Sequence, residues 1–573
     1  MDTLDLFAAE QAQETATTAH PIHFHAEEPD RRAQRRITDL MEKRHVCVVA
    51  FSSGKDSSAL LSLVLLSAMA LKKRGGTPPP IIITHSSTGV ENPIVTRIAQ
   101  GELRKVREYA ARHELDVRTM IGEPDLNASF PVRVIGGRAL PAFASSRADC
   151  SVDWKVQPNR RLLNQAMHEH AHSSEWNLPV VMTGVRANES NARDQRIAHR
   201  GETAEGIWMN DAGDLRASPI LDFETDDVWT HLGLAAAGVY DSYSNFDEVM
   251  EFYRAAGGSS CVIVADMKMA GSSKPCGARS GCWACTRIGS RDKSVEQMIE
   301  SDESRYGFLK PLNRLRTWMA NTQYDWGLRQ YVGRTISNDG FIEIGADTYS
   351  PDTLRKLLIY TLTAEKLTGV PIISLEQLIA IDARWSMYAI APPFTALKTY
   401  FEVVDQARMV EAPEVPLHPP SPVPKIGRIH VGSDWYEATG IGSMAGLRDT
   451  GMEIFHESCG VELKMLANGA LVADYEEGVR FDVDEESAAD FIAFLADDYI
   501  RDYCHHEYGD WTEGFRTYMR LGMITIGAGQ SRITDEILRR SQWRQENQLH
   551  GQRSLQELEE RCTVRYQRQQ SLL

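Results

Sequence analysis

The segment HVCVVAFSSGKDSS, residues 45–58, decides the fold predicted for this chain. Its apolar start, His45 to Phe51, is typical of a buried strand, and the residues from Asp56 to Lys73 are apolar on most sides, as in a buried helix. Small residues at such a junction let the backbone approach a phosphate, and the free amides and dipole of the helix N-terminus favour an anion. The segment therefore predicts an α/β fold with a phosphate-binding loop made of Ser52, Ser53, Gly54, Lys55, Asp56 and Ser57.

Within this loop, Lys55 is expected to neutralise phosphate charge and the serine hydroxyls to donate hydrogen bonds. The pattern Gly-x-x-x-x-Gly-Lys is absent, which excludes a Walker A loop. A serine at position 53 predicts ordinary backbone angles there and a slightly less open loop.

Further strands are expected downstream, alternating with helices. The candidate strands are Ile81–Thr84, Leu115–Ile121 and Leu178–Gly184, and Asn92-Pro93 has the N-cap and first-turn residues of a helix running toward Glu114. This alternation predicts a doubly wound, mostly parallel sheet, in which ligands bind beyond the carboxyl ends of the strands.

The length of 573 residues predicts two or three domains. Helix starts at Ser350 and Ser374, six prolines in 411–425, and the hairpin signal Asn468-Gly469 suggest how the chain divides. We expect a polar N-terminal segment 1–40, an α/β domain 41–295 that includes a cysteine cluster, a helical extension 296–410, a proline-rich linker 411–425 and a C-terminal α+β region 426–573.

The composition is that of a soluble globular protein, with 42% hydrophobic and 25% charged residues. A net charge of −17 argues against a surface built mainly to hold nucleic acid, although Arg31–Arg44 and Arg186–Arg200 are locally basic. The longest apolar run, Ala59–Leu71, is shorter than the about 20 residues that cross a bilayer, and the N-terminus lacks a signal-peptide pattern. We therefore expect a cytoplasmic protein without a membrane partner.

Three of the nine cysteines, Cys276, Cys282 and Cys285, lie within ten residues. Two thiolates separated by two residues can grip one metal centre, and the distant Cys150 would complete four ligands. Four thiolates suit a [4Fe–4S] cluster or, as the alternative, Zn²⁺, and Cys261 is the reserve ligand. A redox dithiol is the other interpretation of the Cys-x-x-Cys pair.

Several motifs together carry a family resemblance. The loop resembles the PP-loop of ATP pyrophosphatases of the adenine-nucleotide alpha-hydrolase type, with Ser53 in place of a glycine. The later motifs resemble, in order and spacing, those of the phosphoadenylyl-sulfate reductase family. They are Ser87-Thr88-Gly89-Val90-Glu91-Asn92-Pro93, then Thr183-Gly184-Val185-Arg186 with Glu189, Ser190 and Arg193, and then Asp226-Asp227-Val228-Trp229.

With the cysteines added, residues 45–310 resemble the DndC and SspD proteins of bacterial DNA phosphorothioation. The resemblance implies that ATP and Mg²⁺ activate a DNA phosphate oxygen, that a partner cysteine desulfurase donates sulfur, and that a [4Fe–4S] cluster is present. It implies catalytic roles for Lys55, Asp56, Arg186 and Arg193, and ATP contacts from Ser52, Ser53, Gly54, Lys55, Asp56, Ser57, Ser87, Glu91, Gly184 and Lys155. The implied cluster ligands are Cys150, Cys276, Cys282 and Cys285.

The resemblance has two departures and leaves two alternatives. Ser87 stands where the family usually has an acidic residue, and five residues instead of six separate Cys276 from Cys282. One alternative is a sulfonucleotide reductase, but neither Cys459 nor Cys562 lies in the Glu-Cys-Gly-[Ile/Leu]-His motif of that class. The other is a non-catalytic nucleotide-sensing scaffold subunit. Arg186 and Arg193 would bind phosphate or, alternatively, pair with a structural carboxylate.

Overall fold

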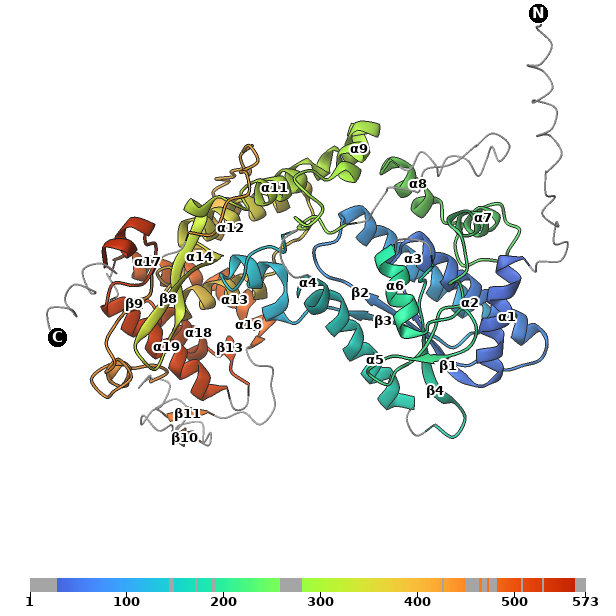
Figure 1. Cartoon of the computed structure of the whole chain (residues 1–573), viewed down its shortest axis with the longest axis horizontal. Coiled ribbons are helices and arrows are strands. Elements are labelled where there is room, and N and C mark those ends of the chain that lie inside the picture. The colour runs from blue at the N-terminus through green and yellow to red at the C-terminus, as the bar shows by residue number, and fades with distance from the viewer. Residues whose placement is uncertain are drawn as a thin grey trace, which may run out of the picture.

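The computed structural model describes residues 28–143, 149–170, 173–187, 191–257, 281–424, 427–448, 463–465, 471–473, 482–505, 509–527 and 530–561. They form two lobes that lie side by side (Figure 1). The first lobe surrounds a six-stranded sheet, and the second contains the elements from α11 (Lys310–Asn321) to α19 (Ser531–Glu546). No helix in these ranges combines the length and the apolar character needed to cross a membrane.

The sheet of the first lobe has the strand order β3-β2-β1-β4-β6-β5. All neighbouring strands run parallel except β5 and β6. This confirms the predicted α/β fold with a mostly parallel sheet. The strands are β1 (His45–Ala50), β2 (Ile81–Ser86), β3 (Val117–Gly122), β4 (Asn177–Met182), β5 (Trp208–Met209) and β6 (Leu215–Ala217).

Helices cover both faces of this sheet, because side chains along a strand alternate between its faces. Cys47 and Val49 of β1 pack into the core on one side, whereas Val46 and Val48 pack on the other side against Leu163 of α5. The helices of this lobe and its edge are α1 (Pro29–Glu42), α2 (Lys55–Lys73), α3 (Pro93–His113), α4 (Asp149–Ser151), α5 (Gln157–His170), α6 (Asn191–Arg200), α7 (Thr225–Ala236), α8 (Asp247–Ala255), α9 (Lys293–Ser301) and α10 (Glu303–Tyr306).

Helix α1 belongs to the first lobe, although the sequence analysis placed most of it in an N-terminal segment. Ala33, Ile37 and Leu40 recur at helical spacing and are buried in the core of the sheet domain. Arg36 is also buried and pairs with Asp222 at 2.7 Å. The polar appearance of residues 29–42 comes from the outer face of an amphipathic helix.

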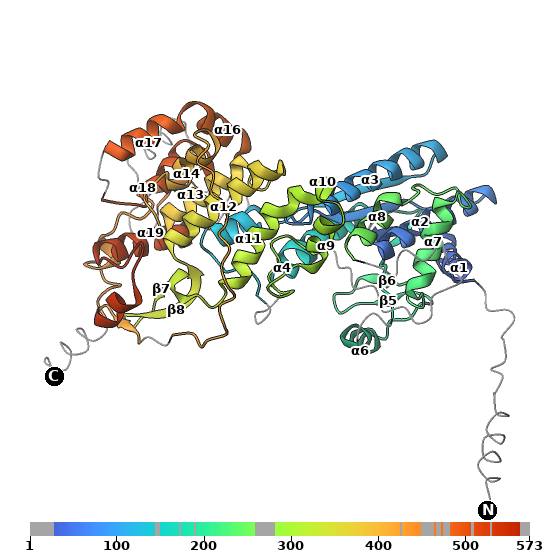
Figure 2. The ribbon, with the colours of Figure 1, turned by 90° about the horizontal axis from the view of Figure 1, so that it is seen from above.

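The two lobes share packing at their junction. The turn η2 (Pro131–Ile135) leaves the first lobe and enters the core of the second, where the indole nitrogen of Trp385 donates to the Ile135 carbonyl at 2.8 Å. Trp154 and Trp283 join the same core, and both meet the ring of Phe130 edge-on. Figures 1 and 2 both show α4 where the lobes meet.

The second lobe is a helical bundle beside a small antiparallel sheet of order β7-β8-β9. Ser350 caps its first long helix, and Ser374 with Gln377 forms the predicted capping box of the next. Its elements are β7 (Arg329–Ile336), β8 (Phe341–Tyr349), α12 (Pro351–Thr368), α13 (Leu375–Met387), α14 (Thr395–Val404), β9 (Ile429–His430), α16 (Glu485–Phe494), α17 (Ala496–His505) and α18 (Glu513–Arg520), with the short antiparallel pairs β10 (Leu463–Met465) with β11 (Leu471–Ala473) and β12 (Asp482–Val483) with β13 (Ile524–Thr525).

The hairpin β7–β8 lies inside the region predicted to be wholly helical, 296–410. Its turn contains Asp339-Gly340, and Gly340 has a φ of 74°. A side chain at that position would meet the carbonyl oxygen of Gly432 on the neighbouring segment. The Asp-Gly turn signal was present in the sequence, but the capped helices on its C-terminal side dominate the local pattern.

The proline-rich segment is packed against the second lobe. Asn321 donates to the Val415 carbonyl at 2.9 Å, Trp326 donates to the Ser421 hydroxyl at 2.8 Å, and Ala412 is buried. One apolar core continues from α12 on one side of the segment to α18 on the other. Regions 296–410 and 426–573, predicted separately, therefore share a core. The Asn468-Gly469 turn lies outside the described residues, between strands β10 and β11.

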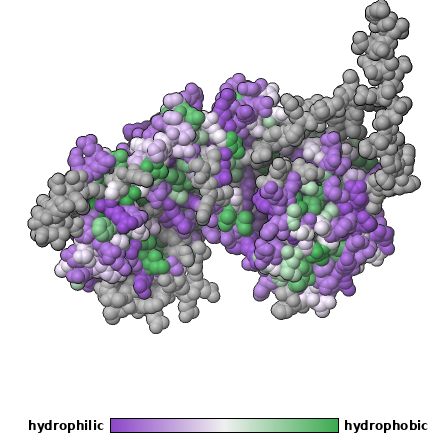
Figure 3. Space-filling model, viewed as in Figure 1, coloured by the Kyte–Doolittle hydropathy of each residue, from purple (hydrophilic) through white to green (hydrophobic). Residues whose placement is uncertain are grey.

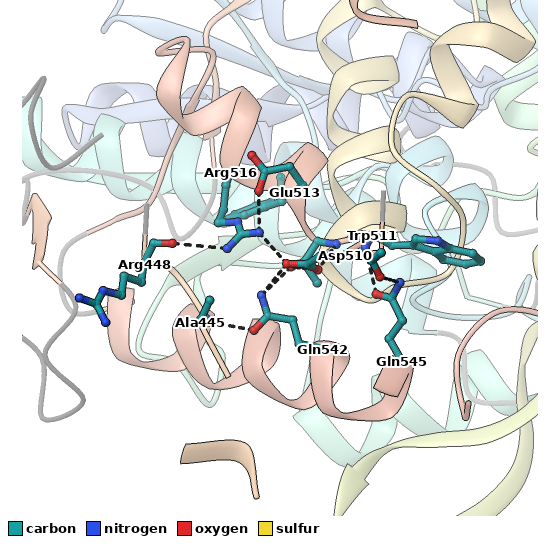
Figure 4. Close-up of polar contacts among 12 residues, drawn as sticks. Ala445, Arg448, Asp510, Trp511, Glu513, Arg516, Gln542 and Gln545 are labelled. Atoms are coloured by element: carbon teal, nitrogen blue, oxygen red, sulfur yellow. Dashed lines mark hydrogen bonds and ion pairs between the residues drawn. The ribbon is translucent and has the colours of Figure 1, made fainter. Parts of the chain in front are cut away.

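A polar network fastens the chain around α19 (Figure 4). Gln542 accepts from the Gly446 amide at 2.8 Å and donates to Asp510, which also receives Arg516 at 2.6 Å. Gln545 accepts from the Trp511 amide at 2.9 Å. These contacts join segments more than sixty residues apart, so α19 acts as a spine for this end of the lobe.

Candidate functional site

The phosphate-loop segment lies at the switch point of the sheet. Strand β1 is flanked by β2 on one side and β4 on the other, so the connections on its two sides run in opposite directions. Residues 51–54 follow β1 and Gly184 follows β4 at the same edge. A crevice opens at such a point in open parallel sheets, and ligands bind there.

Ser53 adopts a left-handed backbone conformation, with φ of 56°. The ordinary angles predicted for this serine are therefore wrong. Its hydroxyl donates to the Ser52 carbonyl at 2.6 Å, a local bond that offsets part of the cost of this conformation. The loop thus takes the shape a glycine would take without strain.

The serine hydroxyls close the loop. Ser57 accepts from the Ser52 amide at 3.2 Å and donates to the Gly54 carbonyl at 3.0 Å, and its hydroxyl oxygen lies 3.1 Å from that of Ser52. Gly54 is the N-cap of α2, and its conformation is extended. The first turn of a 19-residue helix therefore begins directly at the loop, with its dipole favouring an anion.

Three charged side chains form a chain at the start of α2. The Lys55 ammonium lies 2.7 Å from one carboxylate oxygen of Asp56, and the Arg186 guanidinium lies 2.6 Å from the other. Arg186 is 3% exposed and also donates to the Phe223 carbonyl and the Thr225 hydroxyl. Arg186 thus pairs with a carboxylate, as the alternative interpretation proposed, and that carboxylate belongs to the loop itself.

A cleft of about 450 Å³ opens above this loop. Gly184 comes so close to α2 that an added side chain would lie 3.0 Å from the backbone of Asp56 and Ser57, which explains the glycine. The cleft is lined by Ala50, Ser52, Gly54, Asp56, Ser57, Gly184, Val185, Arg196 and Arg200. Its wall therefore combines small residues, hydroxyls, one carboxylate and two guanidinium groups, a lining suited to a polyanion.

Tyr253 of α8 backs the loop from the other side. The Lys55 amide donates to its hydroxyl at 3.4 Å, and the Lys55 ammonium lies 5.9 Å from its ring centroid. Trp229 of α7 meets the same ring edge-on. The motif 226–229 thus supports the loop by packing behind Tyr253.

Three other predicted ATP contacts lie at the ends of β2 and β3 or beside the cysteines. The Ser87 amide donates to the Gly122 carbonyl at 2.9 Å. The Glu91 carboxylate accepts from the Thr88 amide at 3.0 Å, and its backbone bridges to Cys282. Lys155 is exposed near Cys282. None of the three lines the cleft described above, and their contact with ATP stays a prediction.

Arg193 lies in α6, the helix that also carries Arg196 and Arg200. The structure gives its place in the helix but not its side chain. Glu189 and Ser190 lie outside the described residues. A catalytic role for Arg193 stays a prediction.

Three of the four predicted thiol ligands converge at the lobe junction. Cys282 forms its backbone bridge with Glu91, and the Trp283 amide donates to the Val90 carbonyl at 2.8 Å. Burial raises the pKa of the Cys282 thiol to about 11, against the lowering effect of Lys155. Burial also raises the pKa of Cys150, and the charge of Cys285 adds to that rise, so the thiols are within electrostatic reach of one another.

The donor set fits a thiolate metal centre, although it is incomplete in the described chain. Cys276 and Cys261 lie outside the described residues, and within the ranges that are described no three Cys, His, Asp or Glu side chains stand ready as metal ligands. Cys150, Cys282 and Cys285 are all free thiols and half-buried. Beside them the buried Arg316 leaves one guanidinium nitrogen without a hydrogen-bond partner. Soft thiolates of this kind suit iron–sulfur clusters or zinc.

The surface around Cys150 is locally apolar. Val152 and Val156 are 44% and 57% exposed on the turn η3 (Val152–Val156), which follows α4. Figure 3 shows a small apolar patch where the lobes meet, at the place that α4 occupies in Figure 1, on a face that is otherwise mostly hydrophilic.

Fold and loop together define a doubly wound α/β domain with an anion-binding helix start at its switch point. No family model and no curated protein sequence matches this chain. Among solved structures, it resembles the FMN adenylyltransferase of Candida glabrata in complex with FAD and inorganic pyrophosphate, at 13% identity and a TM-score of 0.22. The match covers 38% of this chain and 62% of that enzyme, less than two thirds of its length.

A second similar structure is the U34-tRNA thiolase NcsA from Methanococcus maripaludis with its [4Fe-4S] cluster. Identity is 13% and the TM-score 0.23, with 44% of this chain and 86% of the thiolase covered. Scores this low carry no argument about function, which must rest on the geometry described above.

Four residues at these sites were not found from the sequence alone. Arg196 and Arg200 lie four residues apart on α6, so the basic stretch noted in 186–200 held a helical signal for them. Tyr253 and Arg316 carried no such signal. They reach the loop and the cysteines only because α8 and α11 pack there.

Proposed function

We propose that this chain is an ATP pyrophosphatase that adenylylates a DNA backbone phosphate so that sulfur can replace one of its oxygens. The observation that carries the proposal is the ion-paired chain Lys55–Asp56–Arg186 at a helix N-terminus on the switch point of the sheet. The resemblance of residues 45–310 to DNA phosphorothioation proteins names the substrate class.

In the proposed reaction, a non-bridging oxygen of the DNA phosphate attacks the α-phosphorus of ATP. The bond from the α-phosphorus to the bridging oxygen of the β-phosphate breaks, and pyrophosphate leaves. The DNA oxygen, a very poor leaving group by itself, becomes part of AMP, which leaves readily. A persulfide from the partner cysteine desulfurase then supplies sulfur to the activated phosphorus as AMP departs, and a thiol reductant cleaves the sulfur–sulfur bond that results.

The residues of the loop divide this work. The first-turn amides of α2 and the hydroxyls of Ser52 and Ser57 would hold the leaving phosphates, since they lie at the loop and line the cleft. Lys55 and Arg186 would offset the charge that develops on pyrophosphate. Asp56 presents an oxygen ligand suited to Mg²⁺, which, when bound, would bridge and neutralise phosphate oxygens. Arg196 and Arg200 would receive the second anion, AMP or the DNA backbone.

The thiols would hold the metal centre. Cys150, Cys282 and Cys285, with Cys276, would ligate a [4Fe–4S] cluster, with zinc as the alternative metal. Such a cluster would supply electron or sulfur chemistry near the activated phosphate. The desulfurase, the DNA substrate and a cytoplasmic location are parts of the same proposal.

The test uses the purified full-length chain with its desulfurase, ATP, Mg²⁺ and duplex or single-stranded DNA. We expect pyrophosphate release that depends on DNA, and nuclease-resistant phosphorothioate dinucleotides detected by mass spectrometry. Deleting the gene should remove such dinucleotides from host DNA. Cys459 and Cys562, both outside the described residues, should be replaceable by serine without loss.

Two results would reject the proposal. Conversion of adenylyl sulfate to sulfite, with Cys459 or Cys562 essential, would show a sulfonucleotide reductase. ATP binding without any pyrophosphate release, with or without DNA, would show a scaffold subunit.

A further inference from the structure

Arg316 is a buried cation in the second lobe that reaches the cysteine loop. It belongs to α11 and is 1% exposed. Its Nε donates to the Cys285 carbonyl at 3.0 Å, and its Nη2 donates to the Gly289 carbonyl. One guanidinium thus clamps two carbonyls of the segment that carries Cys282 and Cys285.

The charge of Arg316 has no counter-charge in contact. In the ranges that the structure describes, no carboxylate lies within 4 Å of it, and its Nη1 is buried without a hydrogen-bond partner. Burial lowers the pKa of Arg316, while Asp292 and Cys285 act in the opposite direction from farther away. A buried cation paired only with neutral carbonyls is costly to fold around.

Solvent does not remove this cost. Arg316 and Asn313 line a cavity of about 10 Å³, room for about one water molecule. A water there would satisfy a hydrogen bond of Nη1 but would leave the charge unneutralised. The site therefore asks for an anion, and the groups that the guanidinium already holds in place are the cysteines.

We propose that Arg316 is the positioning residue and counter-charge of an anionic thiolate–metal centre that includes Cys282 and Cys285. The inference rests on the metal site of the proposed function and adds a specific role for a residue of the second lobe. Four thiolates around a metal centre carry net negative charge, which a buried guanidinium stabilises. The same guanidinium fixes the loop through two carbonyls, so that the thiols are held in register.

A merely structural clamp is the competing explanation. It predicts that replacing Arg316 weakens the fold equally with and without metal. A counter-charge predicts a difference, because without the metal centre the buried cation is a cost, whereas with it the cation is a partner. The two explanations therefore separate in one comparison.

The experiment uses the full-length chain purified anaerobically, with its iron, sulfide and zinc content measured. The variants are Arg316→Gln, which removes the charge, and Arg316→Lys, which keeps the charge and loses the planar fork. Arg314→Gln is the matched control, since Arg314 lies two residues away on α11, half-exposed and paired with Glu411 and Glu414. Cys282→Ser serves as the variant with a broken metal site.

We expect metal release to a chelator to be about 10- to 100-fold faster in Arg316→Gln, the range typical of lost partners around metal ligands. Arg316→Lys should fall between it and the wild type, and Arg314→Gln should match the wild type. In the Cys282→Ser background, Arg316→Gln should leave the thermal unfolding temperature unchanged or raise it.

Equal metal release from wild type and Arg316→Gln would overturn the inference while leaving the metal site intact. An equal loss of thermal stability from Arg316→Gln in the wild-type and Cys282→Ser backgrounds would show a structural clamp and would also overturn it. If the wild type binds neither iron nor zinc, the metal site of the proposed function fails, and the inference fails with it. If Arg316→Gln does not fold, the comparison of Arg316→Lys with wild type decides, because normal retention there with disordered fold in the Gln variant would indicate a structural role alone.

Discussion

The two lobes treat buried charge in opposite ways. In the first lobe, Arg186 is buried and its carboxylate partner Asp56 stands on the wall of an open cleft. In the second lobe, Asp382 is 1% exposed and accepts from the amides of Phe394 and Ala396 and from the Tyr518 hydroxyl, all of them internal. One lobe leaves its polar groups facing solvent and the other satisfies them within the fold.

This difference shows where function and where stability reside. Charges that face a cleft at a helix N-terminus are available to a ligand and contribute little to the fold. Charges that cap helices inside a core contribute to the fold and are closed to a ligand. The junction, where Arg316 of the second lobe holds the cysteine loop, is the place where the two roles meet.

Lys55→Ala should give the largest effect and should leave both cores intact. Loss of a cation aimed at developing phosphate charge typically lowers the rate by about 10²- to 10³-fold, and we expect that range for pyrophosphate release. The thermal unfolding temperature should change little, because the only ion pair lost is that with Asp56. Lys73→Ala, at the exposed far end of the same helix, should keep full activity.

Full cleavage of ATP by the Lys55→Ala protein would contradict the assignment of the loop. A large fall in stability would instead contradict the contrast between the lobes, because it would make Lys55 a structural residue.

Asp382→Asn should give the next effect, and only on stability. Burial raises the pKa of Asp382 from 3.8 to about 6. Between these values the folded state binds more protons than the unfolded state, so its stability falls as pH rises and is lowest above pH 6. A shift of this size corresponds to about 2–3 kcal/mol lost between pH 4 and pH 6.5.

The asparagine variant should lack most of this pH-dependent loss, seen by urea unfolding followed by tryptophan fluorescence at both pH values. Asp484→Asn is the opposite control. Asp484 caps α16, and its hydrogen bond with Ser487 lowers its pKa, so its contribution is lost as pH falls. Identical pH profiles for wild type and Asp382→Asn would show that Asp382 does not titrate in the folded chain.

Ser53→Gly should give the smallest effect. Glycine removes the strain of the left-handed conformation, about 1 kcal/mol, but loses the bond to the Ser52 carbonyl and adds flexibility to the unfolded chain. We expect the free energy of unfolding to change by less than about 1 kcal/mol, with pyrophosphate release retained. Ser53→Val should cost more, because a branched side chain resists this conformation. Equal stability of the Gly and Val variants would show that position 53 is not left-handed in solution.

Much of the first lobe followed from local sequence. Strand β1, helix α2 and the Asn92 cap of α3 lie within a residue or two of the predicted positions, because apolar runs and capping residues act over a few neighbours. Those patterns also put the loop at the carboxyl end of β1. Helix α1 and the hairpin β7–β8 were missed, since their burial depends on partners distant in the chain.

The sequence by itself determined the class of fold, the loop and the grouping of cysteines, because each is written in consecutive or regularly spaced residues. Only the tertiary structure decided that Asp56 pairs with both Lys55 and Arg186, that Tyr253 backs the loop, and that Arg316 reaches the Cys285 carbonyl. The physical reason is that these contacts join elements from 31 to 198 residues apart, and their geometry is fixed by the packing of whole helices. Local propensity carries no information about such distances.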